Sequence, residues 1–351
     1  MTRPGPRFVY PAGMAGVELA ELDELFRIVE RGAGLLEVRT ECEVERAGRR
    51  FPLVSVCFGS KAADAPAVGF VAGVHGLERV GTHVVLHFLT QLVARLRWDE
   101  TLQRQVANMR FAFLPLVNPA GMSARTRCNA NGVDLMRNAP VEASERVAFL
   151  VGGQRLTSRL PWYRGAAGAP MEPESEALCA FVRRELLSRP FSIALDCHSG
   201  FGMTDRIWFP HARTRKPFAH LAEVHALSRM FTASYAKVPY IFEPQCRQYL
   251  THGDLWDYLA EIAPSEAIFL PLTLEMGSWR WIRKHPRQLF SRMGIFNPLP
   301  PDRLRRVRRN HMLWLGFLCR AAVSWGEWAP SGAERDRHES EALAAWFEGA
   351  A

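Results

Sequence analysis

The sequence predicts an α/β protein in which helices cover a mixed, mostly parallel β-sheet. Helical patterns alternate along the chain with short, continuous apolar runs, which are typical of strands buried on both faces. Four such runs lie at residues 67–74, 110–118, 191–198 and 267–276. Two more strand-like segments, 35–45 and 51–59, are joined by the sequence AGRR. Because this connection is short, we expect a hairpin that adds antiparallel strands to the sheet.

Helices are expected before, between and after these strands. Helical periodicity covers residues 16–32, 80–97, 173–188, 217–233, 252–262 and a long basic stretch near 301–326. A short strand is expected at 237–242. No repeat or low-complexity linker divides the chain, so we predict a single domain over residues 1–330. The Ala- and Glu-rich residues 331–351 are expected to form a peripheral C-terminal tail.

The composition is that of an ordinary globular protein. Of 351 residues, 48% are hydrophobic and 23% are charged, which excludes wholesale disorder. The formal net charge of +8 would suit acidic partners, but much of the excess lies in one late segment. Its arginines are Arg303, Arg305, Arg306, Arg308 and Arg309. Without a nucleic-acid-binding motif nearby, this segment is interpreted as a solvated helix face, and no nucleic-acid partner is expected.

Cysteine usage and hydropathy predict a soluble, cytoplasmic protein. The seven cysteines are scattered and include no CxxC pair, which favours reduced thiols. The first residues, MTRPGPRFVYPAG, lack the apolar run of a signal peptide. No stretch reaches the roughly 18 uncharged apolar residues of a membrane span, so no membrane partner is expected. The sequence does not indicate an oligomeric state.

Polar side chains follow several of the predicted strands, where α/β sheets place their ligands. His75 and Glu78 follow the run at 67–74, His198 ends the run at 191–198, and Glu275 lies at the end of 267–276. Two histidines and one carboxylate are a standard catalytic zinc set that leaves a fourth position for water. The sequence therefore predicts one zinc ion, with His75, Glu78 and His198 as ligands.

A second histidine pair competes for this assignment. His83 and His87 lie four residues apart in HVVLH, so they would share one face of a helix. The segment lacks the glutamate of HExxH zinc helices, and its other residues are apolar. We interpret this pair as structural, which leaves the metal to His75 and Glu78.

The motifs HGLE, NPAGMSARTRCNANGVDLMRN, DCHSG and TLEMGS, in this order, resemble the zinc carboxypeptidases of the funnelin (M14) family. The resemblance covers about residues 67–280. It implies a three-layer α/β/α sandwich around a mixed, mostly parallel eight-stranded sheet, with one zinc at its edge. The predicted domain would then be a zinc carboxypeptidase-like catalytic domain.

Carried over position by position, the resemblance also implies roles for individual residues. The zinc ligands would be His75, Glu78 and His198, in agreement with the strand-end argument. Glu275 would be the general base, Arg127 would stabilise the oxyanion, and Asp134 would hold the imidazole of His75. Tyr249 would cover the substrate, with Tyr258 as a second choice.

One motif departs from the family pattern. The family reads DLNRN where this chain has DLMRN, so Met136 replaces an asparagine that helps to bind the substrate's terminal carboxylate. Arg137, with Asn138 beside it, is left to bind substrate. An arginine can hold a carboxylate through a bidentate fork, whereas methionine offers no donor. Recognition of the terminal carboxylate is therefore expected to be altered.

These observations predict a zinc metallopeptidase that hydrolyses an amide bond in a small peptide or an amino-acid conjugate. The alternative is an N-acyl-amino-acid deacylase, which resembles aspartoacylase and succinylglutamate desuccinylase; the distance from Arg127 to Asp134 in the sequence favours the carboxypeptidase branch. A third possibility is a non-catalytic zinc-binding protein, because Met136 breaks the carboxylate clamp. The predicted metal, base and oxyanion residues are all present, which favours catalysis.

Overall fold

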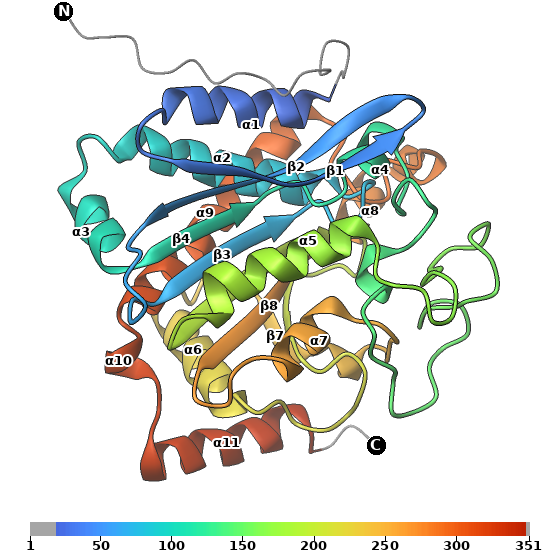
Figure 1. Cartoon of the computed structure of the whole chain (residues 1–351). Helices are drawn as coiled ribbons and strands as arrows, with labels where there is room; N and C mark the ends of the chain where they lie inside the picture. Colours follow the sequence, from blue (N-terminus) through green and yellow to red (C-terminus); the bar gives the residue numbers. More distant parts are fainter. Residues whose placement is uncertain (1–18, 349–351) are drawn as a thin grey trace, which may run out of the picture.

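The computed structural model describes residues 19–348 and contains one eight-stranded mixed sheet (Figure 1). The strands are β1 (Glu37–Arg46), β2 (Arg49–Gly59), β3 (Ala67–Ala72), β4 (Arg110–Leu114), β5 (Phe191–Ser199), β6 (Arg206–Phe209), β7 (Ile241–Pro244) and β8 (Ile268–Met276). Their order in the sheet is β1-β2-β4-β3-β5-β8-β6-β7. The four central strands β4, β3, β5 and β8 are parallel, whereas β1, β2 and the β8–β6 pairing are antiparallel.

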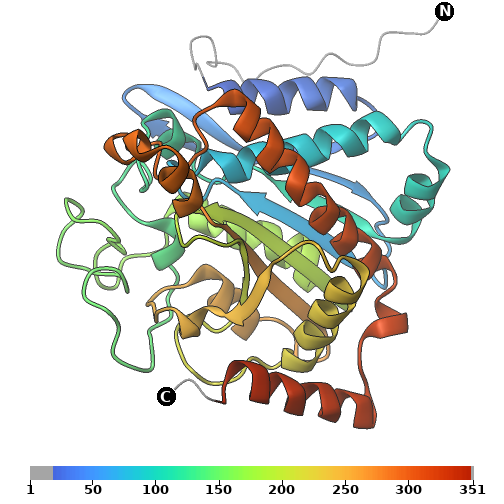
Figure 2. The ribbon, with the colours of Figure 1, turned by 180° about the vertical axis from the view of Figure 1, so that it is seen from behind.

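Helices cover both faces of the sheet and form the outer layers. One face packs against α1 (Ala20–Arg31), α2 (Arg79–Arg95), α6 (Leu221–Ser234), α9 (Pro301–Val323) and α11 (Gly332–Trp346). The opposite face packs against α5 (Pro173–Val182), which continues as a π-helix to Leu187, and α7 (Leu255–Glu261). Figure 1 shows α5 and α7 in front of the sheet, and Figure 2 shows α9 crossing the other face. The shorter helices are α3 (Glu100–Asn108), α4 (Pro119–Ser123), α8 (Trp279–Lys284) and α10 (Trp325–Trp328).

The predicted fold class is confirmed. The four continuous apolar runs form the parallel centre of the sheet, and every residue of β3, β4 and β5 is buried. The predicted hairpin forms β1 and β2. The elements that were not predicted include α3, α4, α8 and α11, and also β6, which has only four residues. The strand predicted at 237–242 begins only at Ile241, because the preceding residues form a turn in which the Val238 amide donates to the Tyr235 carbonyl (2.9 Å).

The residues after Pro330 form α11, which packs against α6 through the buried side chains of Ala342 and Trp346. The division into a domain over 1–330 and a peripheral tail over 331–351 stays a prediction. The predicted first helix begins at Ala20, and residues 16–18 of that prediction lie outside the described residues. All seven cysteines are free thiols, as their spacing predicted. Within residues 19–348, no helix has the length and apolarity needed to cross a membrane.

Gly81 allows α2 to approach the end of β5 closely. A Cβ atom on Gly81 would lie 2.1 Å from the carbonyl oxygen of Cys197, the residue before His198. We expect Gly81→Ala to force the helix away from the strand and to destabilise the fold by about 1–3 kcal/mol or more. Urea unfolding measures this change. Gly316→Ala in α9 is the control, because its Cβ would meet only the end of the Arg320 side chain at 3.5 Å. Equal stability of the two variants would contradict the proposed close packing.

Candidate metal centre and cavity

Three neighbouring parallel strands bring the predicted metal and base residues to one edge of the sheet. His75 and Glu78 lie in the turn between β3 and α2. His198 lies on β5, next to β3, and Glu275 on β8 is its direct register partner. Each of these four side chains is buried, with no more than 6% of any residue exposed. All three strands run in the same direction, so their carboxyl ends lie at the same edge of the sheet. This arrangement brings His198 next to Glu78, which precedes it by 120 positions in the chain.

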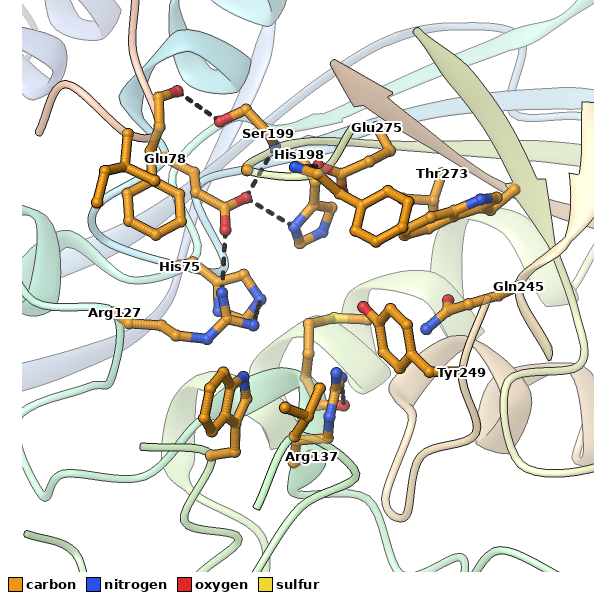
Figure 3. A pocket seen from close by; sticks show the side chains of 18 of the residues that line it. His75, Glu78, Arg127, Arg137, His198, Ser199, Gln245, Tyr249, Thr273 and Glu275 are labelled. Atoms are coloured by element: carbon orange, nitrogen blue, oxygen red, sulfur yellow. Dashed lines mark hydrogen bonds and ion pairs between the residues drawn. The ribbon is translucent and has the colours of Figure 1, made fainter. Parts of the chain in front are cut away.

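The three predicted metal ligands lie together. His75, Glu78 and His198 each offer a ligand atom, and these atoms are within 4.8 Å of one another. Glu78 Oε2 lies 3.1 Å from His198 Nδ1 and accepts a hydrogen bond from the Ser199 amide (3.0 Å). Figure 3 shows the Glu78 carboxylate beside both imidazoles. Donors around a tetrahedral zinc are about 3.3 Å apart, so the group needs little adjustment to hold the ion.

Asp196 fixes the orientation of His198. Its Oδ2 lies 2.6 Å from His198 Nε2 and also accepts a hydrogen bond from Trp256 Nε1 (2.9 Å). Asp196 and His198 are two residues apart on one strand, so their side chains leave the same face of the sheet. A carboxylate on the far nitrogen of a metal-binding histidine sets its tautomer and raises its basicity. Asp196 therefore supports His198 and does not merely cap the strand.

Arg127 lies inside the cluster. Its guanidinium contacts His75 Nε2 (2.8 Å), Glu78 Oε1 (3.2 Å) and Asp134 Oδ2 (2.9 Å). Asp134 Oδ1 is 3.6 Å from His75 Nδ1, a buried nitrogen for which residues 19–348 provide no hydrogen-bond partner. Two imidazoles and one carboxylate in a buried cluster fit a zinc ion. Binding of the ion would displace the guanidinium from Glu78 and His75 toward the cavity.

The charges of the cluster reinforce one another. Burial lowers the pKa of His75 well below its usual value, and the neighbouring Arg127 adds to this effect. Burial opposes the charged form of His198, but the carboxylates of Asp196 and Glu78 outweigh it and raise the His198 pKa. Burial also opposes ionisation of Glu78, yet the nearby His75 and His198 keep its pKa low. A bound metal ion would add positive charge beside Glu78 and would further stabilise its ionised carboxylate.

Glu275 faces the metal cluster from β8. Burial and the negative charge of Glu78 raise its pKa to about 8. Its Oε1 accepts a hydrogen bond from the Phe201 amide (3.0 Å), which fixes one carboxylate oxygen. A carboxylate with a raised pKa is a stronger proton acceptor once it is ionised. The position of Glu275 beside the cluster therefore suits a general base.

A cavity of about 420 Å³ opens over the cluster. His75, Glu78, Arg127, His198 and Glu275 form its polar end. The remaining lining is mostly neutral, and sequence reasoning identified only some of it; these residues include Met136, Arg137, Trp162, Phe201, Trp208, Gln245, Tyr249, Thr273, Trp279 and Phe296. A cavity of this size fits a short segment of a small substrate rather than a folded protein.

Arg137 is a buried cation that lines this cavity. Only 3% of the residue is exposed, and no carboxylate among residues 19–348 forms an ion pair with it. Its Nε is buried without a hydrogen-bond partner in that part of the chain. The Tyr249 ring lies 6.0 Å from its guanidinium carbon, and Figure 3 shows both side chains directed into the cavity. Because an unpaired buried cation is costly, this arginine is suited to receive an anionic group of a ligand.

Arg164 holds the backbone beside Arg137. Its Nε donates to the Arg137 carbonyl (3.0 Å), while its terminal nitrogens contact Glu142 at 2.8 and 3.0 Å. Sequence reasoning missed this residue. It comes from an irregular loop with no periodic pattern, so no signal in the sequence linked it to Arg137.

The other predicted site residues lie apart from the cavity. Asn138 does not line it: its amide accepts from the Glu172 backbone (2.6 Å) and donates to the Arg164 carbonyl (3.1 Å). Tyr258, the second choice for the substrate tyrosine, instead accepts from Arg183 (2.8 Å). In the HVVLH pair, His83 contacts Glu21 (3.2 Å) and His87 contacts Gln91 (3.2 Å). Neither histidine belongs to a potential metal-binding group within the described chain.

Comparison with a family model identifies most of this architecture. The model described as zinc carboxypeptidase matches residues 44–265, more than half of the chain. Carboxypeptidase SOL1 of Arabidopsis thaliana is 37% identical over 75 residues, which are 21% of this chain and 15% of that protein. Carboxypeptidase D of Anas platyrhynchos is 25% identical over 175 residues, 46% of this chain and 11% of that protein. The chain thus spans a small part of the length of these curated relatives.

Solved structures agree on the fold. A structure of thrombin activatable fibrinolysis inhibitor superposes with a TM-score of 0.65 at 18% identity, covering 86% of this chain and 74% of that one. Carboxypeptidase A from Helicoverpa armigera gives a TM-score of 0.62 at 17% identity, covering 86% and 72%. The eight-stranded sheet, the ordered motifs and the family match lead to one conclusion: this chain belongs to the M14 zinc carboxypeptidase family.

Proposed function

We propose that this chain is a zinc-dependent metallocarboxypeptidase that removes a residue from the free C-terminus of a short peptide. The observation that carries the proposal is Arg137, a buried cation without a carboxylate partner in residues 19–348, in the same cavity as the His75–Glu78–His198 cluster. A terminal carboxylate held by Arg137 would place the preceding peptide bond toward this cluster. We further propose that the protein acts in the cytoplasm, as the free cysteines suggest.

Each residue around the cluster has a separate task in this proposal. Zinc held by His75, Glu78 and His198 would polarise the peptide carbonyl and make water a nucleophile near neutral pH. Glu275 would accept the proton of the attacking water and return it to the departing amine. Arg127, which lines the cavity, would turn from Glu78 toward the carbonyl oxygen and stabilise its negative charge, an effect of roughly 3–4 kcal/mol.

Part of the cavity lining carries no charge, which supports a substrate with a small, uncharged side chain. Trp208, Gln245 and Thr273 line this space without contributing a net charge. Tyr249 is half-buried among them, and desolvation raises its pKa, so its phenol stays protonated and can donate a hydrogen bond to substrate.

Three matched substrates test the proposal by mass spectrometry of the products: a peptide with a free C-terminus, its C-terminal amide, and an N-acyl amino acid. We expect loss of one C-terminal residue from the free peptide and no cleavage of the amide. Cleavage of the N-acyl amino acid alone would assign the deacylase activity, since Arg137 could also bind that carboxylate. Normal zinc content without cleavage of any substrate would leave a non-catalytic zinc-binding protein.

Met136 offers a direct test of the carboxylate site. It lines the cavity next to Arg137 and presents no donor. We expect Met136→Asn to raise kcat/KM for the free peptide by about three- to tenfold, because one added hydrogen bond contributes about 0.5–1.5 kcal/mol. Met136→Leu is the control of similar volume and is expected to change little. An equal effect of both variants would place the carboxylate site away from Met136.

A further inference from the structure

A second group of metal-binding side chains joins the two helices α6 and α11. His225 comes from α6, and His338 and Glu341 come from α11. The Nδ1 atoms of the two histidines are 2.9 Å apart, and Glu341 Oε2 lies 3.9 Å from His225 Nδ1. One ligand atom from each residue lies within 4.8 Å of the other two. Like the cluster in the cavity, this group consists of two imidazoles and one carboxylate.

Apolar packing holds the two helices together independently of any ion. Ala342 on α11 is fully buried, and the Trp346 ring lies 4.7 Å from Phe209 and 5.6 Å from His225, measured between ring centres. His338 and Glu341 are three residues apart, so both project from one face of α11. The protein thus fixes the backbone from which all three side chains extend.

We propose that His225, His338 and Glu341 bind a zinc-like divalent transition-metal ion that fastens α11 to α6. Imidazole and carboxylate donors suit Zn²⁺, and three protein ligands leave one position for water. Donors around a tetrahedral ion are about 3.3 Å apart, so the imidazoles must separate slightly and Glu341 must approach. The Glu341 side chain is 54% exposed and is free to make this movement.

The surrounding charges favour a bound cation. His338 Nε2 lies 4.0 Å from Glu334 Oε1, where a carboxylate can orient a metal-binding histidine. The competing arrangement is one N–H···N hydrogen bond between the two rings, which would not need Glu341.

Zinc stoichiometry of the full-length protein distinguishes these arrangements. Chelator-treated protein is equilibrated with Zn²⁺, exchanged into metal-free buffer and analysed by mass spectrometry for bound zinc. We expect about two zinc ions in the unsubstituted chain, one in His338→Gln, one in His198→Ala and none in the double variant. Glu341→Gln should weaken the second site by about tenfold or more, because a charged ligand is lost. Glu339→Gln, on the same helix, is the matched control because Glu339 forms an ion pair with Arg335 and is not part of the proposed ligand set.

The proposal is overturned if His338→Gln binds as much zinc as the unsubstituted chain, or if Glu341→Gln and Glu339→Gln behave alike. A second measurement distinguishes loss of zinc binding from misfolding. Added Zn²⁺ should raise the Tm of His198→Ala, but it should not raise the Tm of the double variant His198→Ala, His338→Gln. His338→Gln should retain the peptidase activity of the unsubstituted protein. The experiments therefore test the proposed metal site between α6 and α11 separately from the proposed peptidase activity, and either proposal can be wrong without the other.

Discussion

Glu275→Gln is expected to lower kcat by about 10³-fold or more while leaving the zinc content unchanged. The substitution preserves the shape of the side chain and its hydrogen bond from the Phe201 amide, but an amide cannot accept the proton of the attacking water. General-base catalysis alone typically contributes 10²–10⁴-fold. Steady-state kinetics on the free peptide, together with zinc analysis of the same sample, measure both quantities.

Glu266→Gln is the matched control for this substitution. It makes the same chemical change in an exposed loop just before β8, where the Glu266 carboxylate accepts a hydrogen bond from the Ser265 hydroxyl at 3.2 Å. Its activity should equal that of the unsubstituted chain. If zinc content falls together with activity in Glu275→Gln, then Glu275 is a ligand or a structural residue, and the base must be sought elsewhere.

His198→Ala is expected to abolish activity by removing the active-site zinc. His198 is one of the three proposed ligands and connects Glu78 to the buried Asp196–Trp256 pair. Loss of a partner outside the ligand set alone costs 10–100-fold in metal affinity, so loss of a ligand should cost more than about 100-fold. Zinc titration in a His338→Gln background counts the active-site ion alone.

His83→Ala is the control from the competing histidine pair. His83 lies on α2 and contacts Glu21, a carboxylate that also pairs with Arg79. We expect this variant to bind zinc as the unsubstituted chain does, although it removes a buried contact and lowers stability. Retention of zinc by His198→Ala and its loss in His83→Ala would reverse the ligand assignment.

The sequence predicted the centre of the fold well because its strands are buried on both faces. β3, β5 and β8 appear as continuous apolar runs, and such runs leave few alternatives. α3 was missed because it is short, with nine residues, and only Leu102 of that helix is buried. β6 was missed because four residues are too few to establish a pattern.

The candidate site could be predicted where it depends on strand ends. His75, His198 and Glu275 all follow from the rule that parallel strands end at one edge. Asn138 shows the limit of this reasoning: its neighbour Arg137 lines the cavity, whereas its own amide binds backbone atoms of a distant loop. Trp162 enters the cavity from that irregular region, where neither periodicity nor spacing indicates which side chain points inward.

The place of β8 in the sheet has a consequence for how the protein is made. β8 is the last strand of the described chain, yet it lies between β5 and β6. Until the ribosome has released residues 268–276, one edge of β5 has no partner strand. During that time β6 and β7 cannot pair with the rest of the sheet, because β6 joins it through β8. Glu275 is on that same strand, so the proposed base enters the site when β8 completes the sheet. A chain interrupted before β8 would therefore be inactive and prone to aggregate.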